Sequence, residues 1–110
     1  MAFWWWLLQR VSGLLLLVLL GAHLILTHFI TPAEAIRFAS VQGRMAIPVV
    51  VVLDYGMLFV ALFHGLYGLF VVIRDWLPEA ISPKALASGL VVVGVGLAIL
   101  GAYTLSVFLV

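Results

Sequence analysis

Three long apolar stretches separated by short polar segments dominate the sequence. They run over about residues 8–30, 47–74 and 85–109. Each is long enough to cross the hydrocarbon core of a bilayer as a helix, which takes about 20 apolar residues. Prolines lie at the boundaries, because proline cannot continue a helix but fits its first turn. They occur in Thr31-Pro32, at Pro48, in Leu77-Pro78 and in Ser82-Pro83. The pattern predicts an all-α integral membrane protein with three transmembrane helices in a single domain, residues 1–110.

The composition agrees with a membrane protein and excludes several functions. Of the 110 residues, 67% are hydrophobic and 8% are charged, whereas soluble domains average about 45–50% and about 25%. A net charge of +1 argues neither for nor against nucleic acid, but five basic residues are too few to favour a nucleic-acid surface. The absence of cysteine excludes disulfides, and it excludes thiolate ligation of haem or of an iron–sulfur cluster by this chain. Any chemistry therefore lies within the membrane or in a partner.

Charge distribution and the length of the first stretch predict where the chain resides. The tripeptide at 33–35, Ala-Glu-Ala, resembles a signal cleavage site, but the apolar stretch before it is longer than that of a typical signal peptide. We expect this stretch to be retained. Without an Arg/Ser-rich transit segment, a bacterial or archaeal cytoplasmic (inner) membrane is favoured. One side of the membrane would carry three basic residues, Arg10, Arg74 and Lys84, and the other side two, Arg37 and Arg44. Because basic residues are more frequent on the cytoplasmic side, this distribution predicts a cytoplasmic N-terminus.

Two histidines, His23 and His64, fall deep inside the first and second stretches. An ionisable residue at such depth is costly and usually functional. At about 1.5 Å per residue, His64 lies about 15 Å from both Arg74 and Asp54, near the middle of the membrane. His23 lies about 20 Å from Arg10, slightly beyond the middle. A buried imidazole needs a metal such as haem iron, a hydrogen bond to a neighbouring helix, or a place in a proton relay. Two of them on adjacent helices favour a cofactor.

Other residues near the histidines have more than one interpretation. Ala61 and Gly68 lie one turn on either side of the second histidine, and they fit either helix packing or clearance for a flat macrocycle. Asp54 is expected to be solvated, to pair with Arg44 or to handle protons. His28 reaches the far interface, where an imidazole can be solvated.

Two motifs at the ends of consecutive stretches are specific in combination. The first is Arg10-Val11-Ser12-Gly13, followed by a histidine at 23. The second begins with an aspartate at 54. After nine intervening residues follow His64-Gly65-x-x-Gly68 and then Arg74-Asp75-Trp76. In these residues the chain resembles the membrane-anchor cytochrome b subunits of succinate dehydrogenase and fumarate reductase, specifically the smaller D-type subunit. The resemblance covers the first two stretches.

The resemblance implies a function and a set of partners. The chain would form half of a heterodimeric helix bundle with a second three-helix anchor subunit. The bundle would hold an iron–sulfur subunit and a flavoprotein subunit on the bilayer, with no catalytic activity of its own. His64 would be an axial ligand of haem b. His23 would mark the kind with two haems, each shared with the partner anchor. Electrons from succinate would reach a quinone, either ubiquinone or menaquinone.

Four further residues are implied at the quinone or at the haem propionates: Arg10, Ser12, Asp75 and Trp76. Trp76 departs from the pattern, because some family members have a tyrosine there. An indole N–H donates a hydrogen bond but cannot accept one.

Three alternatives stay open at this point. The estimated depths of the two histidines differ by only about 5 Å, so one haem within this chain could take both. The chain could also be a haem-free structural anchor, or a proton-relay subunit of another respiratory membrane complex.

Overall fold

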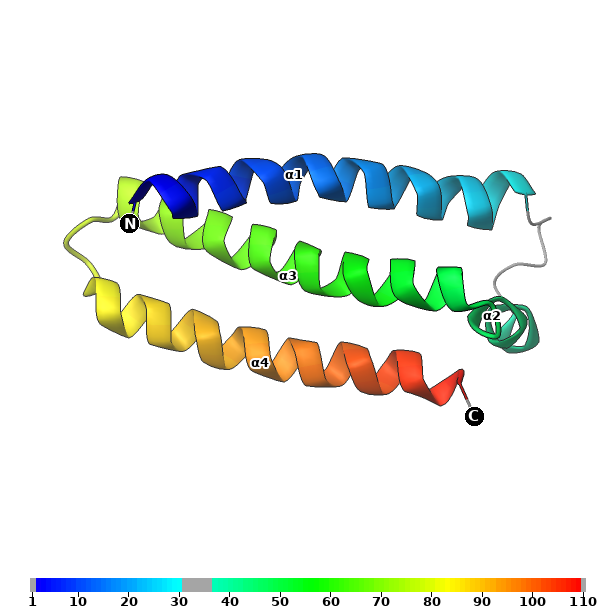
Figure 1. Cartoon of the computed structure of the whole chain (residues 1–110). Helices are drawn as coiled ribbons and strands as arrows, with labels where there is room; N and C mark the ends of the chain where they lie inside the picture. Colours follow the sequence, from blue (N-terminus) through cyan, green and yellow to red (C-terminus); the bar gives the residue numbers. More distant parts are fainter. Residues whose placement is uncertain (1, 31–36, 110) are drawn as a thin grey trace.

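Three long antiparallel helices make up most of the chain. The computed structural model describes residues 2–30 and 37–109. The long helices are α1 (Ala2–Leu24), α3 (Pro48–Trp76) and α4 (Pro83–Val107), and a short helix, α2 (Phe38–Met45), crosses the end of the row (Figure 1). A π-helical segment, Ile25–Ile30, continues α1. All three long helices are long and apolar enough to cross a membrane, and the described residues contain no strand. The predicted all-α membrane fold is confirmed.

Helix ends follow the prolines that the structure describes. Pro48 lies in the first turn of α3. Ser82 caps α4, where its hydroxyl oxygen accepts a hydrogen bond of 3.1 Å from the Ala85 amide. The predicted turn at 31–34 lies outside the described residues. Helix α1 starts at Ala2, six residues before the predicted start at 8, because the tryptophans at 4–6 interrupt the aliphatic pattern without interrupting the helix.

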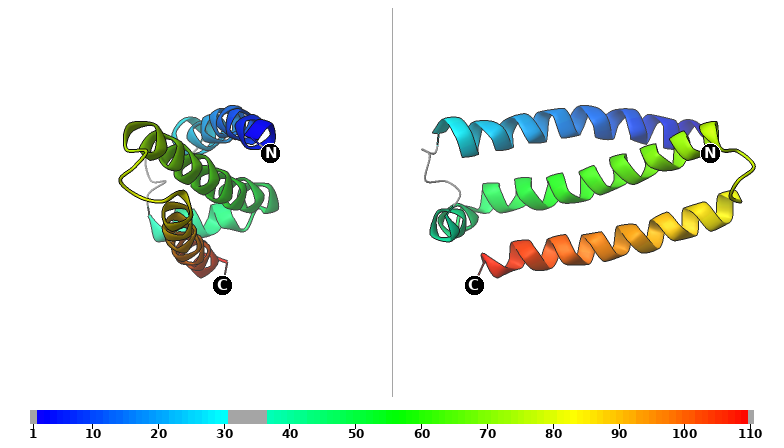
Figure 2. Two further views of the ribbon diagram at one scale, coloured as in Figure 1. Left: turned by 90° about the vertical axis from the view of Figure 1, so that its left-hand side faces the viewer. Right: turned by 180° about the vertical axis from the view of Figure 1, so that it is seen from behind.

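The long helices form an open layer rather than a closed bundle. Helix α3 packs against both α1 and α4, whereas α1 and α4 do not contact each other within the described residues. The end-on view in Figure 2 shows α3 between the other two. Among the described residues, only Ser12, Met45 and Leu86 are buried. Both broad faces of the layer are therefore left for lipid or for other polypeptides.

Glycines allow α3 and α4 to approach closely. A Cβ at Gly94 would lie 2.7 Å from a methyl of Leu66, and one at Gly101 would lie 2.7 Å from a methyl of Leu58. Tyr55 adds a hydrogen bond of 3.3 Å from its hydroxyl to the Ala102 carbonyl. Small residues have this packing role in many membrane helices. The glycines of α4 at these two positions thus serve helix packing.

Aromatic contacts join α1 to α3 near the N-terminus. The Trp5 ring stacks on Tyr67 at 5.6 Å and on Phe63 at 6.2 Å between centroids. Phe63 and Tyr67 stack on each other at 5.8 Å. Trp5 is thus a packing residue of the helix pair.

Helix α2 was not predicted from the sequence. Its Phe38 packs on Phe108, the residue that follows α4, with ring centroids 4.8 Å apart, and Met45 is 3% exposed. The apolar residues Phe38, Val41 and Met45 follow helical spacing, a signal too short to stand out beside the long apolar stretches.

Candidate functional site

The imidazole of His64 is held against α1 by a serine whose hydrogen-bond roles can be assigned. Ser12 Oγ donates to the Gln9 carbonyl at 2.9 Å and lies 3.1 Å from His64 Nδ1. A hydroxyl has one hydrogen, so towards His64 the serine oxygen must accept. Nδ1 therefore carries the proton, and Nε2 carries the lone pair that a metal would bind.

The backbone around His64 is fixed by two further residues of α1. Gln9 Nε2 donates a hydrogen bond of 3.1 Å to the His64 carbonyl. A Cβ at Gly13 would lie 3.1 Å from His64 Cε1, so only glycine lets the ring approach this closely. The sequence analysis missed Gln9, although Gln9, Ser12 and Gly13 lie at i, i+3 and i+4 on one helix face.

Gly68 lies against a side chain of α1. A Cβ there would lie 3.1 Å from Gln9 Nε2. Gly68 therefore takes part in the contact between α1 and α3, and clearance for a macrocycle stays a prediction.

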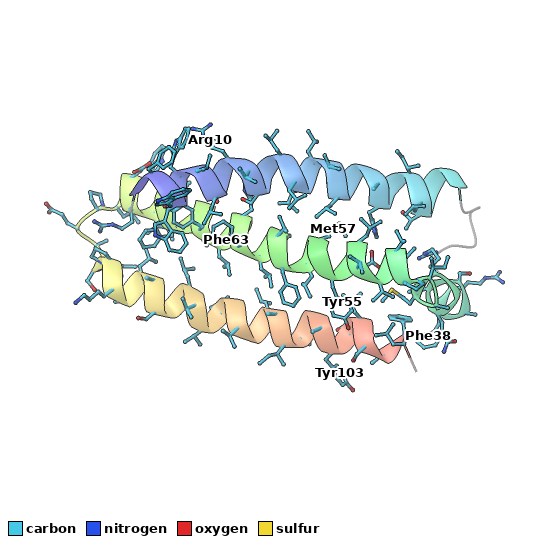
Figure 3. The ribbon with its side chains drawn as sticks, viewed as in Figure 1. Arg10, Phe38, Tyr55, Met57, Phe63 and Tyr103 are labelled. Atoms are coloured by element: carbon cyan, nitrogen blue, oxygen red, sulfur yellow. The ribbon has the colours of Figure 1, made fainter. Side chains whose placement is uncertain are left out.

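His64 opens on a groove between α1 and α3 with a volume of about 740 Å³. Within the described part of the chain, the one buried side-chain polar atom without a hydrogen-bond partner is Gln9 Oε1. His64 Nε2 also has no hydrogen-bond partner in the described residues, but it is not among the buried atoms. It is therefore accessible. Arg10 lies at the groove, with its guanidinium 5.2 Å from the centre of the Trp6 ring. Figure 3 shows Arg10 on the side of α1 that faces away from α4. The other lining residues are Gly13, Leu14, Tyr67 and Val71.

The imidazole of His23 faces a carboxylate of α3. Its Nδ1 lies 3.4 Å from Asp54 Oδ1, and the two side chains are 34% and 17% exposed. The two groups are thus within ion-pair distance, at a separation longer than an ordinary hydrogen bond. The His23 carbonyl accepts a hydrogen bond of 2.7 Å from Thr27, where α1 passes into the π-helical segment. Asp54, which was expected to pair with Arg44, thus has His23 as an ion-pair partner.

A small cavity of about 30 Å³ lies beside His23 and Asp54. It has room for about one or two waters and none for a haem-sized group. Helix α2 covers it with Val41, Arg44 and Met45. A large ligand of His23 would therefore approach from the exposed side of the imidazole.

The helix register separates the two histidines. Ser12 faces His64 and His23 faces Asp54, so the two levels are eleven residues apart along α1. This is about 16 Å along the helix, whereas two axial nitrogens on one iron lie about 4 Å apart. The alternative of one haem gripped by both histidines of this chain is wrong. The estimate of about 5 Å failed because Arg10 lies inside the span beside His64, not level with Arg74.

The predicted quinone or propionate residues fall into two groups. Ser12 and Arg10 lie at the level of His64, and the Ser12 hydroxyl is occupied by Gln9 and the imidazole. Asp75 and Trp76 are exposed at the end of α3, about 16 Å farther along the helix. The side chain of His28 lies outside the described residues, so its role stays open.

Neither histidine belongs to a complete metal site within the structure. Among the side chains that the structure describes, no group of three His, Cys, Asp or Glu residues could hold a metal ion. Each imidazole is thus a single potential ligand, and any metal bound there needs ligands from elsewhere.

The fold and site define a helical integral membrane protein with two separate single-imidazole sites. The chain belongs to the family of succinate dehydrogenase/fumarate reductase transmembrane subunits, which matches residues 1–108. It is also 37% identical over 70 residues to the succinate dehydrogenase hydrophobic membrane anchor subunit of Archaeoglobus fulgidus. That match covers 64% of this chain and 59% of the length of the archaeal protein.

Proposed function

We propose that this chain is the membrane-anchor subunit of a succinate:quinone oxidoreductase and that it holds b-type haem through His64 and His23. The observation that carries the proposal is the state of the His64 ring. Nδ1 is tied to Ser12, while Nε2 keeps its lone pair and opens on the groove. Metal-ligating histidines are commonly oriented in this way through their second nitrogen.

The groove residues fit a haem in three respects. His64 offers an axial nitrogen, Gly13 leaves the ring in its place, and Arg10 can pair bidentately with a propionate carboxylate. Ser12 acts as a positioning residue, because its hydroxyl is already used. Haem b bound by two histidines takes up and releases one electron and has no open position for oxygen.

A second anchor subunit is proposed because this chain supplies only one ligand to each site. Each site supplies one imidazole, and the three helices form an open layer. We infer that a second three-helix anchor subunit provides the other axial ligand of each haem and completes the bundle, with this chain as the D-type subunit. Two haems are proposed, because the two histidines cannot share one iron within the chain.

The soluble partners and the quinone belong at the cytoplasmic end. Asp75 and Trp76 lie exposed at the C-terminal end of α3, beside Arg74 and near Lys84 at the start of α4, and Trp76 is 81% exposed. We place the quinone headgroup there, with Trp76 as a hydrogen-bond donor. The flavoprotein and iron–sulfur subunits would dock on the same side of a bacterial or archaeal cytoplasmic membrane. They would carry the succinate chemistry, with none in this chain.

A spectrum of the complex purified with its soluble subunits tests this proposal. His64→Ala is expected to lose b-type absorbance in the reduced-minus-oxidised difference spectrum while the subunits still co-purify. Leu69→Ala is the matched control, because it makes the same truncation at an exposed position of α3. Absence of b-type absorbance from the unmodified complex would instead indicate a haem-free anchor or a proton-relay subunit.

A further inference from the structure

We propose that the groove between α3 and α4 binds one hydrocarbon chain of an anionic membrane lipid, and that Arg74 and Lys84 hold the headgroup of this lipid. The groove is separate from the His64 groove, which lies between α1 and α3. A second anchor subunit at the His64 groove leaves the α3–α4 groove open to the bilayer. The inference goes beyond the proposed function, and it stands whether or not the histidines bind haem.

The α3–α4 groove is apolar and has a volume of about 610 Å³. Its α3 wall is aromatic and includes Phe63, Tyr67 and Phe70, on which the Trp5 ring of α1 stacks near one end. Its α4 wall consists of small and branched residues, among them Val91, which is 62% exposed. The residues that line the groove carry no charge. In a bilayer, such a groove is filled by hydrocarbon or by protein.

The length of the groove matches one leaflet of a bilayer. It runs from Phe59 to Phe70 along α3 and from Ala87 to Ala98 along α4, which is about 16 Å in each case. The hydrocarbon core is about 30 Å thick, so one leaflet accounts for about 15 Å. A helix is about 10–12 Å wide, and the same length of helix would need roughly two to three times the volume of the groove. An extended hydrocarbon chain therefore fits better than a helix.

Two cations lie at the end of the groove where a headgroup belongs. Arg74 follows Phe70 by four residues and Lys84 precedes Ala87 by three, so helical spacing places each cation on the face that lines the groove. Each lies about 5–6 Å beyond the apolar lining. The Arg74 side chain is held at this end, because its Nη1 donates a hydrogen bond of 2.9 Å to the Pro78 carbonyl.

These cations favour an anionic headgroup over a zwitterionic one. Neither Arg74 nor Lys84 forms an ion pair within the part of the chain that the structure describes. Two acidic residues lie at the same end. Asp75 is seven residues after Gly68, on the face towards α1, and Glu79 in the connection opposes only one of the two positive charges. Each basic residue near a membrane surface strengthens the binding of anionic lipid about fivefold.

Photolabelling of the purified complex in phosphatidylcholine nanodiscs tests the groove. A phosphatidylglycerol with a diazirine in its acyl chain is expected to attach to residues of the groove, which mass spectrometry locates. Val91→Trp places an indole in the groove and should remove most of this labelling. Val92→Trp is the matched control, because Val92 is 72% exposed and does not line the groove.

The double change of Arg74→Gln and Lys84→Gln tests the headgroup. Loss of both cations should lower labelling by phosphatidylglycerol at least about tenfold. Labelling by a phosphatidylcholine with the same photoreactive chain should be weaker from the start and should not change. Arg37→Gln is the control, because it removes an exposed basic residue at the other end of the layer, just before α2.

Several results would overturn the lipid site. Equal labelling by the two lipids in the unmodified complex contradicts the headgroup assignment, and this comparison decides alone should the double variant fail to assemble. Equal labelling of Val91→Trp and Val92→Trp contradicts the groove. A groove that neither lipid labels is covered by protein, and labelling that an added polyisoprenoid quinone displaces belongs to the quinone tail. Haem content should be the same in all these variants, so its loss bears on the proposed function alone.

Discussion

Gly13 offers the sharpest test of how α1 positions His64. In Gly13→Ala the new Cβ would lie 3.1 Å from Cε1 and 3.6 Å from Nδ1 of the imidazole. The ring must then retreat by a few tenths of an ångström, away from the contact with Ser12. Overpacking of this kind costs about 1–3 kcal/mol. Alanine also favours the helix over glycine by about 0.8–1 kcal/mol, which offsets part of this cost.

Because the contact is with the imidazole itself, the displaced ring should also weaken haem binding. Within the overpacking range, about 1.4 kcal/mol corresponds to a tenfold weaker affinity. We expect Gly13→Ala to show reduced haem occupancy and a changed low-spin haem signal in electron paramagnetic resonance, which reports axial-ligand geometry. Gly21→Ala is the control on the same helix, because a Cβ there meets nothing within 4 Å. If the two variants bind haem equally well, the tight fit around His64 has no functional meaning.

Two other changes have expected outcomes. Ser12→Ala should keep the His64 haem at lower occupancy, since a neutral hydrogen bond contributes about 0.5–1.5 kcal/mol; an unchanged haem content on pyridine haemochrome assay would contradict its positioning role. Gly94→Ala and Gly101→Ala should each lower the thermal stability of the detergent-solubilised complex, because each new Cβ would lie 2.7 Å from a leucine methyl of α3. Gly96→Ala, which meets nothing within 4 Å, should leave the melting temperature unchanged, and equal melting temperatures for all three would contradict the packing role.

The three helices were predictable because lipid imposes a strong pattern. A spanning helix must satisfy its own backbone hydrogen bonds, so length and apolar character predict it well. Pro48 and Ser82-Pro83 then marked helix starts correctly. Helix α2, Phe38–Met45, was not predicted because the apolar pattern of a helix of eight residues is too short to stand out.

The site was predictable in its residue types but not in its register. His23 and His64 stand out in any hydropathy pattern, yet their relative depth depends on how far α1 slides along α3. The sequence offered Arg10 and Arg74 as a common level, and the structure places Arg10 beside His64 instead. Nothing in the spacing pairs His23 with Asp54, because contacts between helices depend on packing at both surfaces.

The haem content of the purified complex tests the two-site interpretation most directly. The helix register and the two single imidazoles predict two b-type haems per copy of this chain. His64→Ala and His23→Ala should each lose one of them, with different absorbance components disappearing in the two variants. A content of one haem that both variants abolish would contradict the separation of about 16 Å between the two histidines.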